Sequence, residues 1–191
     1  LERDEWGEPE VLLSAQTSGA SAAQPKVSPD GRHLLFCLSK FGNFPVYQAS
    51  SDLFVMDLET KQISRPDINS DRSDSWHCWS SNSRWVVFSS KRLDGLFARP
   101  FFTYVDAQGR FHKPFLLPQA DPAFYDSYLK TFNVPELVRG PVVVSEKTLA
   151  GAITKPSRVL VPQAVAQPGV STQPPAPDGD AERSMYRPNP Q

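Results

Sequence analysis

Three histidines, His33, His77 and His112, are the side chains best able to bind a metal or exchange a proton near neutral pH. Their wide separation gives none of the close ligand spacings that are typical of zinc sites. His77 is the strongest binding candidate, because Trp76 and Trp79 flank it on a segment with the length of a strand. A histidine packed in a core is the simpler interpretation, so we assign no metal site and no cofactor.

Oxygen-bearing side chains form an acidic connector that contains Asp67, Asp71 and Asp74. Calcium prefers such oxygens, but the spacing differs from that of an EF-hand loop. A solvated loop with local turns made by its own aspartates is therefore the favoured interpretation. Asp74, at the end of the connector, is kept with His77 as a candidate for binding a partner.

A short charged loop, Lys91-Arg92-Leu93-Asp94-Gly95, follows an apolar segment. Such a loop is either a turn with solvated charges or a surface that faces a partner. We take Lys91, Arg92 and Asp94 as candidate partner-binding residues. The chain has no G-x-S-x-G elbow and no glycine-rich phosphate loop, so no catalytic residue is assigned.

An internal repeat indicates the elements that position these residues. Ser28–Phe36 lines up with Ser80–Phe88, and Asp52–Asp57 lines up with Phe102–Asp106, at a period of about 50 residues. Each copy has a turn, a basic residue and then an apolar strand. These patterns predict two four-stranded units in which the apolar strand is buried on both faces.

The turns differ between the two copies. Pro29-Asp30-Gly31 is a strong turn signal, whereas Asn82 and Ser83 take the place of the Asp-Gly pair in the second copy. Further along each copy, the polar segments 62–65 and 113–117 are predicted to be the outer strands. We therefore expect both copies to have the same fold despite their different turn residues.

The block Ser28–Arg32, followed by an apolar strand and by Asp52–Asp57, resembles the TolB-like β-propeller repeat. The second copy adds Trp79-Ser80 before its turn and Val87–Arg92 after it, both similar to the family pattern. The resemblance implies an all-β fold, a partial β-propeller of about two four-stranded blades. It also implies a periplasmic or secreted location and a role in binding proteins.

Two blades cannot bury their own faces, since closed propellers usually have about 4–8 of them. We therefore expect this chain to be a C-terminal fragment of a larger propeller. Residues 1–22 are expected to be the outer strand of a preceding blade with its connector, and residues 23–70 and 71–120 to be one blade each. Residues 121–154 are expected to form a short helix with a closing segment, and residues 155–191 a disordered Pro-rich tail. Within the fourth part, Asp121 is predicted to cap a helix over 121–130, and residues 140–144 to form a last strand.

The net charge of −1 provides no basic footprint for nucleic acid, and no apolar segment is long enough to span a bilayer. Cys37 and Cys78 are interpreted as buried free thiols, with a disulfide as the alternative in an oxidising compartment. The favoured function is a non-catalytic propeller segment that binds a protein or peptide through its blade loops. The alternative is an accessory propeller part of a larger hydrolase or lyase whose catalytic residues lie elsewhere.

Overall fold

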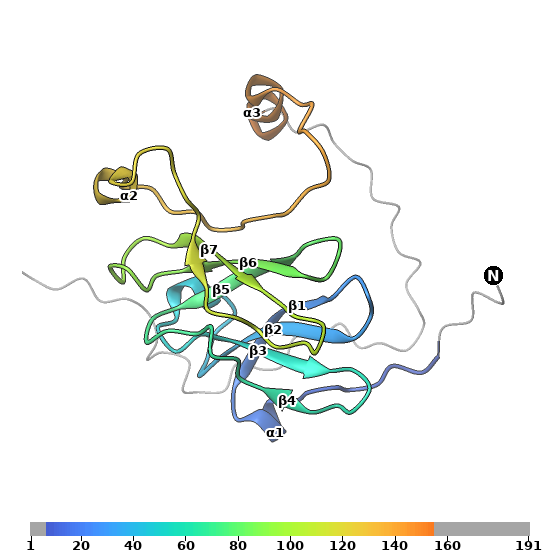
Figure 1. Ribbon diagram of the computed structural model, residues 1–191. Coiled ribbons are helices and arrows are strands. Elements are labelled where there is room, and N and C mark those ends of the chain that lie inside the picture. The colour runs from blue at the N-terminus through green and yellow to red at the C-terminus, as the bar shows by residue number, and fades with distance from the viewer. Residues whose placement is uncertain (1–6, 155–191) are drawn as a thin grey trace, which may run out of the picture. The chain divides into compact units, whose positions relative to one another are not determined.

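The computed structural model describes residues 7–154, which divide into two compact units on either side of residue 143 (Figure 1). The first unit contains two four-stranded antiparallel sheets, with strand orders β1-β2-β3-β4 and β5-β6-β7-β8. The described part of the second unit covers residues 144–154 and contains the helix α3 (Glu146–Thr154). The prediction of a mostly β chain with two four-stranded antiparallel units is thus confirmed.

The elements of the first unit follow one another as two similar hairpin series. The first sheet has β1 (Ser21–Val27), β2 (His33–Ser39), β3 (Asp52–Asp57) and β4 (Ile63–Ser64). The second has β5 (Asp74–Trp79), β6 (Trp85–Ser90), β7 (Arg99–Tyr104) and β8 (Phe115–Leu116). Three short helices complete the unit: α1 (Ala15–Ser18), η1 (Pro45–Tyr47) and α2 (Phe124–Ser127).

The turn between the first two strands of each sheet has the same hydrogen bonds in both. The amide of Ser28 donates to the carbonyl of His33 at 2.8 Å, and the amide of Ser80 donates to that of Trp85 at 2.8 Å. Each serine hydroxyl also accepts from the amide of the same partner at 2.9 Å. The sequence repeat is therefore a structural repeat.

Asn82 and Ser83 replace the Asp-Gly pair without changing the turn. In the first turn the Ser28 hydroxyl donates to Asp30 Oδ1 at 2.6 Å. In the second turn the Ser80 hydroxyl donates to Asn82 Oδ1 at 2.7 Å. Gly31 has φ 75° and Ser83 has φ 57°, both in the left-handed region. Because a side chain is disfavoured there, Ser83 adopts this conformation at a cost that Gly31 avoids.

A β-bulge interrupts the first strand of each sheet, β1 or β5, at the same place. The pairing of β1 with β2 shifts between Ala23 and Lys26, and that of β5 with β6 shifts between Ser75 and Cys78. Gln24 (φ 57°) and Trp76 (φ 47°) are the positive-φ residues of the two bulges. Two unrelated side chains thus share one strained backbone geometry.

Strand pairing corrects one detail of the sequence alignment. His33 pairs with Asp57, and the equivalent Trp85 pairs with Tyr104, not with Asp106. An added bridge beyond β7 lengthens the second hairpin, so that Asp106 begins its turn later than Asp57 does. The sequence repeat aligns Asp57 with Asp106, whereas the strand pairing makes Asp57 equivalent to Tyr104.

The two sheets pack face to face around one apolar core, with β5 against β1, β2 and β3. The core is contributed by both sheets and by the connector between them: Leu35, Cys37, Leu53, Val55, Ile68, Trp79, Val86, Phe88, Phe101 and Val105. Full burial of one large apolar side chain contributes about 1.5–3 kcal/mol. Face-to-face burial is therefore what holds the two repeats together.

The segment after the second sheet differs from expectation. The predicted helix over 121–130 is one turn, α2, which begins after Ala123 and not at Asp121. Residues 140–144 form no strand, because no described strand pairs with them, and α3 was not predicted. The expectations for residues 1–6 and for the tail 155–191 lie outside the described residues.

Candidate functional site

The candidate residues Asp74, Arg92, Lys91 and Asp94 lie at one end of the second sheet, where β5 begins and β6 ends. The amide of Lys91 donates to the carbonyl of Ser73 at 3.0 Å, which holds the two segments together. His77 lies further along β5 and is buried between the sheets. The structure therefore brings four of the five candidates together and separates the fifth.

Asp74 and Arg92 form an ion pair at the base of this end. Arg92 Nη2 donates to Asp74 Oδ1 at 2.9 Å and to the carbonyl of Ile68 at 2.6 Å. The other carboxylate oxygen accepts from the amide and the hydroxyl of Ser70, at 2.6 and 2.8 Å. Asp74 is thus buried with its oxygens occupied, and it anchors the acidic connector to the second sheet.

The Arg92 guanidinium also stacks against the core. Its central carbon lies 4.5 Å from the ring centre of Phe101 and 5.3 Å from that of Phe88. A partly desolvated cation over aromatic rings gains about 0.5–2 kcal/mol. Arg92 therefore supports the loop that follows β6 and does not project from it.

Above this base, the residues 40–50 and 91–97 form what we call the loop surface. Its large apolar side chains are more than half exposed: Phe41, Phe44, Tyr47, Leu93 and Leu96. Lys91 Nζ lies 5.4 Å from the centre of the Tyr47 ring, so the two loops touch. Clustered exposed apolar side chains on loops are typical of interaction sites.

Hydrogen bonds hold the loop surface in place. The buried Ser73 hydroxyl donates to the carbonyl of Pro45 at 2.8 Å and so fixes η1 to the start of β5. Asp94 Oδ1 accepts from the amides of Leu96 and Phe97, at 2.7 and 2.8 Å. Burial raises the pKa of the Asp94 carboxyl, but these amides outweigh it and the net pKa lies below the usual value. Asp94 is therefore ionised and shapes its own loop.

His77 has the environment of a packed histidine. Its Nε2 lies 2.9 Å from the carbonyl of Leu35, and its Nδ1 lies 3.9 Å from Cys37 Sγ. Burial lowers the pKa of His77 to about 4, although the bond to the Leu35 carbonyl opposes the shift. The imidazole is therefore neutral at pH 7 and donates from Nε2.

The contact between Cys37 and His77 does not activate the thiol. Burial raises the pKa of Cys37 to about 12, and its Sγ lies 3.3 Å from Gln24 Oε1. A nucleophilic cysteine needs the opposite shift, toward the thiolate. Both Cys37 and Cys78 are free and buried, as the sequence favoured.

The other two histidines lie apart from His77. His112 Nε2 is 3.2 Å from Asp106 Oδ2 at the exposed turn of the second sheet. His33 stacks on Trp79 with ring centres 6.4 Å apart. Within residues 7–154, no three histidine, cysteine, aspartate or glutamate side chains are grouped so as to hold a metal ion.

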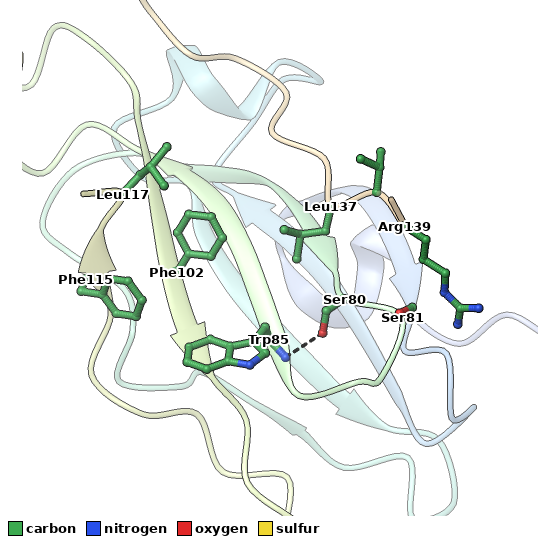
Figure 2. Close-up of a pocket in the computed structure, with 9 residues that line it drawn as sticks. Ser80, Ser81, Trp85, Phe102, Phe115, Leu117, Leu137 and Arg139 are labelled. Atoms are coloured by element: carbon green, nitrogen blue, oxygen red, sulfur yellow. Dashed lines mark hydrogen bonds between the residues drawn. The ribbon is translucent and has the colours of Figure 1, made fainter. Parts of the chain in front are cut away.

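A second surface feature is a groove of about 420 Å³ on the outer face of the second sheet. Figure 2 shows the rings of Trp85, Phe102 and Phe115 lining it from the sheet, with Leu137 on the opposite side. Trp85 is 37% and Phe115 45% exposed. The apolar spacing of these residues predicts strands, but it does not tell which face stays open.

Arg99 is a buried arginine that the sequence did not single out. Its guanidinium donates to the carbonyls of Tyr128 (2.5 Å) and Lys130. The rings of Phe97, Tyr125 and Tyr128 surround it, with centres 5.1–5.5 Å away. No ion pair of the described chain includes Arg99, and its Nε has no hydrogen-bond partner, so the two carbonyls and the rings make the contacts of this cation. Arg99 thereby holds the segment after β8 to the second sheet.

No described helix is long and apolar enough to cross a membrane. Comparison with known proteins found no family model that matches the chain and no curated protein that matches it.

Proposed function

We propose that the first unit is a pair of adjacent β-propeller blades of the TolB-like type, and that it binds a protein or peptide through the loop surface. The support for blades is that each sheet is a four-stranded antiparallel meander with the same turn and the same bulge. The inner strands β1 and β5 are neighbours in the face-to-face stack. Adjacent blades around a propeller axis have this relationship.

The outer face of the second sheet supports the same interpretation. Trp85, Tyr104 and Phe115 are large and partly exposed there, although they lie on regular strands. A large apolar face on a sheet is usually covered by another layer. A further layer of strands, stacked as the second sheet is stacked on the first, would cover it.

The loop surface is the observation that carries the binding role. It combines exposed aromatic and aliphatic side chains with a base that the buried Asp74–Arg92 pair holds rigid. Binding hot spots are apolar anchors on a preorganised support, because little entropy is lost when they bind. Lys91 adds a cation beside Tyr47. The chemistry therefore fits a peptide with apolar anchors and an acidic residue.

A periplasmic or extracellular location accompanies this function, by the resemblance of the repeats alone. Cell fractionation of the protein in its natural host tests it directly. Recovery in the cytoplasm would contradict the location without affecting the binding role.

The binding role is tested by selecting peptides from a displayed random library on the whole chain. Tyr47→Ser and Leu96→Ser should each weaken the selected peptides by about tenfold or more, as expected for anchors worth about 1.4 kcal/mol. Val27→Ser is the matched control, since Val27 is also a half-exposed apolar residue but lies on β1. Selected peptides that ignore both loop substitutions would refute the role of the loop surface.

A further inference from the structure

The segment 132–137 lies on the second sheet as β5 lies on the first. The amide of Asp74, at the start of β5, donates to the carbonyl of Ser51 at 2.9 Å. The amide of Phe132 donates to the carbonyl of Ala98 at 3.0 Å. Ser51 and Ala98 each immediately precede the third strand of their sheet, so the two bonds are equivalent.

The other end of the segment shows the same correspondence. Trp79 Nε1, at the end of β5, donates to the carbonyl of Lys26 at 3.1 Å. The amide of Leu137 lies 3.5 Å from Cys78 Sγ. Lys26 and Cys78 follow the bulge at equivalent places in their inner strands. Trp79 makes its contact through the indole ring and Leu137 through its backbone, so the atoms differ. In both cases the last residue of the segment contacts the residue that follows the bulge of the preceding sheet.

The sequence of the segment agrees with this position. Residues 74–79 and 132–137 span equal lengths, and Pro135-Glu136-Leu137 parallels Pro25-Lys26-Val27 at the end of β1. Segment 132–137 thus corresponds to the inner strand of a third unit. It is not assigned as a strand because no neighbouring strand pairs with it.

The face beneath the segment is equivalent to the buried face of the first sheet. The register pairs Leu35 with Val55 in the first sheet and Val87 with Phe102 in the second. Val55 is buried by the second sheet, whereas Phe102 is only partly covered and lines the groove. The groove is therefore the space that the second and third strands of a further unit would fill.

The backbone of the segment is open on one side. The Ser89 hydroxyl contacts the carbonyls of Phe132 and Asn133, at 2.7 and 2.8 Å. Within the described chain, the amides of the alternate residues Val134 and Glu136 donate no hydrogen bond. Unpaired amides along an extended segment are a template for another strand.

We propose that segment 132–137 and the adjoining groove bind an extended strand of a partner polypeptide by β-augmentation. The partner strand pairs with the free amides of the segment and places its alternate apolar side chains on Phe102, Phe115 and Trp85. The partner strand should resemble in sequence the apolar strands β2 and β6, which pair with the inner strands β1 and β5. This site rests on the proposed blade architecture and is distinct from the loop surface.

The test uses a fluorescein-labelled peptide that copies residues 32–40 with Cys37→Ser, titrated with the whole chain and followed by fluorescence anisotropy. Binding with a Kd of about 100 µM or tighter is expected. Glu136→Pro removes one free amide and should weaken binding by about tenfold or more. Glu136→Ala removes the exposed ion pair with Lys26 but keeps the amide, and should change Kd by less than about twofold.

Backbone-methylated peptides repeat the test without changing the protein. Methylation of alternate amides on the pairing edge should abolish binding, and methylation on the opposite edge should leave it intact. The inference is overturned if the peptide does not bind, if Glu136→Pro and Glu136→Ala behave alike, or if both methylated peptides bind. Tyr47→Ser should leave this peptide unaffected, so the failure of the groove and the failure of the loop surface are read separately.

Discussion

The two sheets share one backbone but differ in what covers them. Val27 and Trp79 end the inner strands at equivalent positions, yet Val27 is 52% exposed and Trp79 only 6%. Trp79 inserts between the sheets and bonds to the first, whereas Val27 has no sheet to insert against among residues 7–154. The difference teaches that the position of a repeat in the stack, more than its fold, determines which side chains carry its stability.

Replacing each of these two residues by alanine tests the difference most strongly. Trp79→Ala should cost about 3–5 kcal/mol of unfolding free energy because it leaves a cavity in the core. Val27→Ala should cost less than about 1 kcal/mol, since Val27 is half exposed. Urea denaturation of both variants measures the contrast. Similar losses at the two positions would mean that Trp79 is not a core residue.

His77 in β5 and Pro25 in β1 hold equivalent positions, and only His77 can be protonated. The dependence of stability on pH therefore tests a second difference between the two sheets. The unfolded chain protonates His77 below pH 6.5, but the folded chain resists protonation until about pH 4. The unfolded state therefore binds more protons in this window. The contribution of His77 is complete above pH 6.5 and is lost as the pH falls toward 4.

Between pH 7.5 and pH 5, this difference amounts to a loss on the order of 2 kcal/mol of unfolding free energy. Urea denaturation at the two pH values measures it in the natural chain and in His77→Gln, which keeps a donor for the Leu35 carbonyl. The variant should lose less stability on acidification. An equal loss in both proteins would show that other groups cause the acid sensitivity.

The smallest expected difference is between two turn glycines, Gly31 and Gly109, in the stability that each loses on substitution by alanine. Gly31 has φ 75° with open space around an added Cβ, so Gly31→Ala should cost about 1 kcal/mol from backbone conformation alone. Gly109 has φ 77°, and an added Cβ would lie 2.6 Å from His33 Nε2 of the first sheet. Gly109→Ala should therefore cost about 2 kcal/mol, conformation and crowding together.

A second substitution separates these two terms. In a His33→Ala background, the cost of Gly109→Ala should fall to that of Gly31→Ala, because the crowding is gone. Melting and urea midpoints of the four variants provide the measurement. An unchanged cost would show that the turn of the second sheet does not press on His33.

Local patterns were enough for the strands but not for their neighbours. The duplicated turn and apolar strand predicted β2 and β6, and the polar segments 62–65 and 113–117 contain the shorter β4 and β8. Segment 132–137 was missed because its residues alternate poorly and include a proline, so its strand-like position is visible only from its contacts with Ala98 and Cys78.

The candidate site divides in the same way. Lys91 and Asp94 were recognised because charges in a loop are visible in sequence, but Asp74 and Arg92 proved to be a buried pair beneath the loop. Tyr47 and Leu96 were overlooked because an apolar residue in a loop has no periodicity that marks it as exposed. Their exposure depends on which segments happen to cover them.

The amino-acid sequence by itself determined the repeat, its turns and its apolar strands, since these depend on local φ preferences and on the alternation of side chains. Only the tertiary structure decided which face of each sheet is covered, where the loops meet and which ionisable groups are buried. Those properties depend on contacts between residues distant in the chain, and the free energy of each contact depends on everything packed around it.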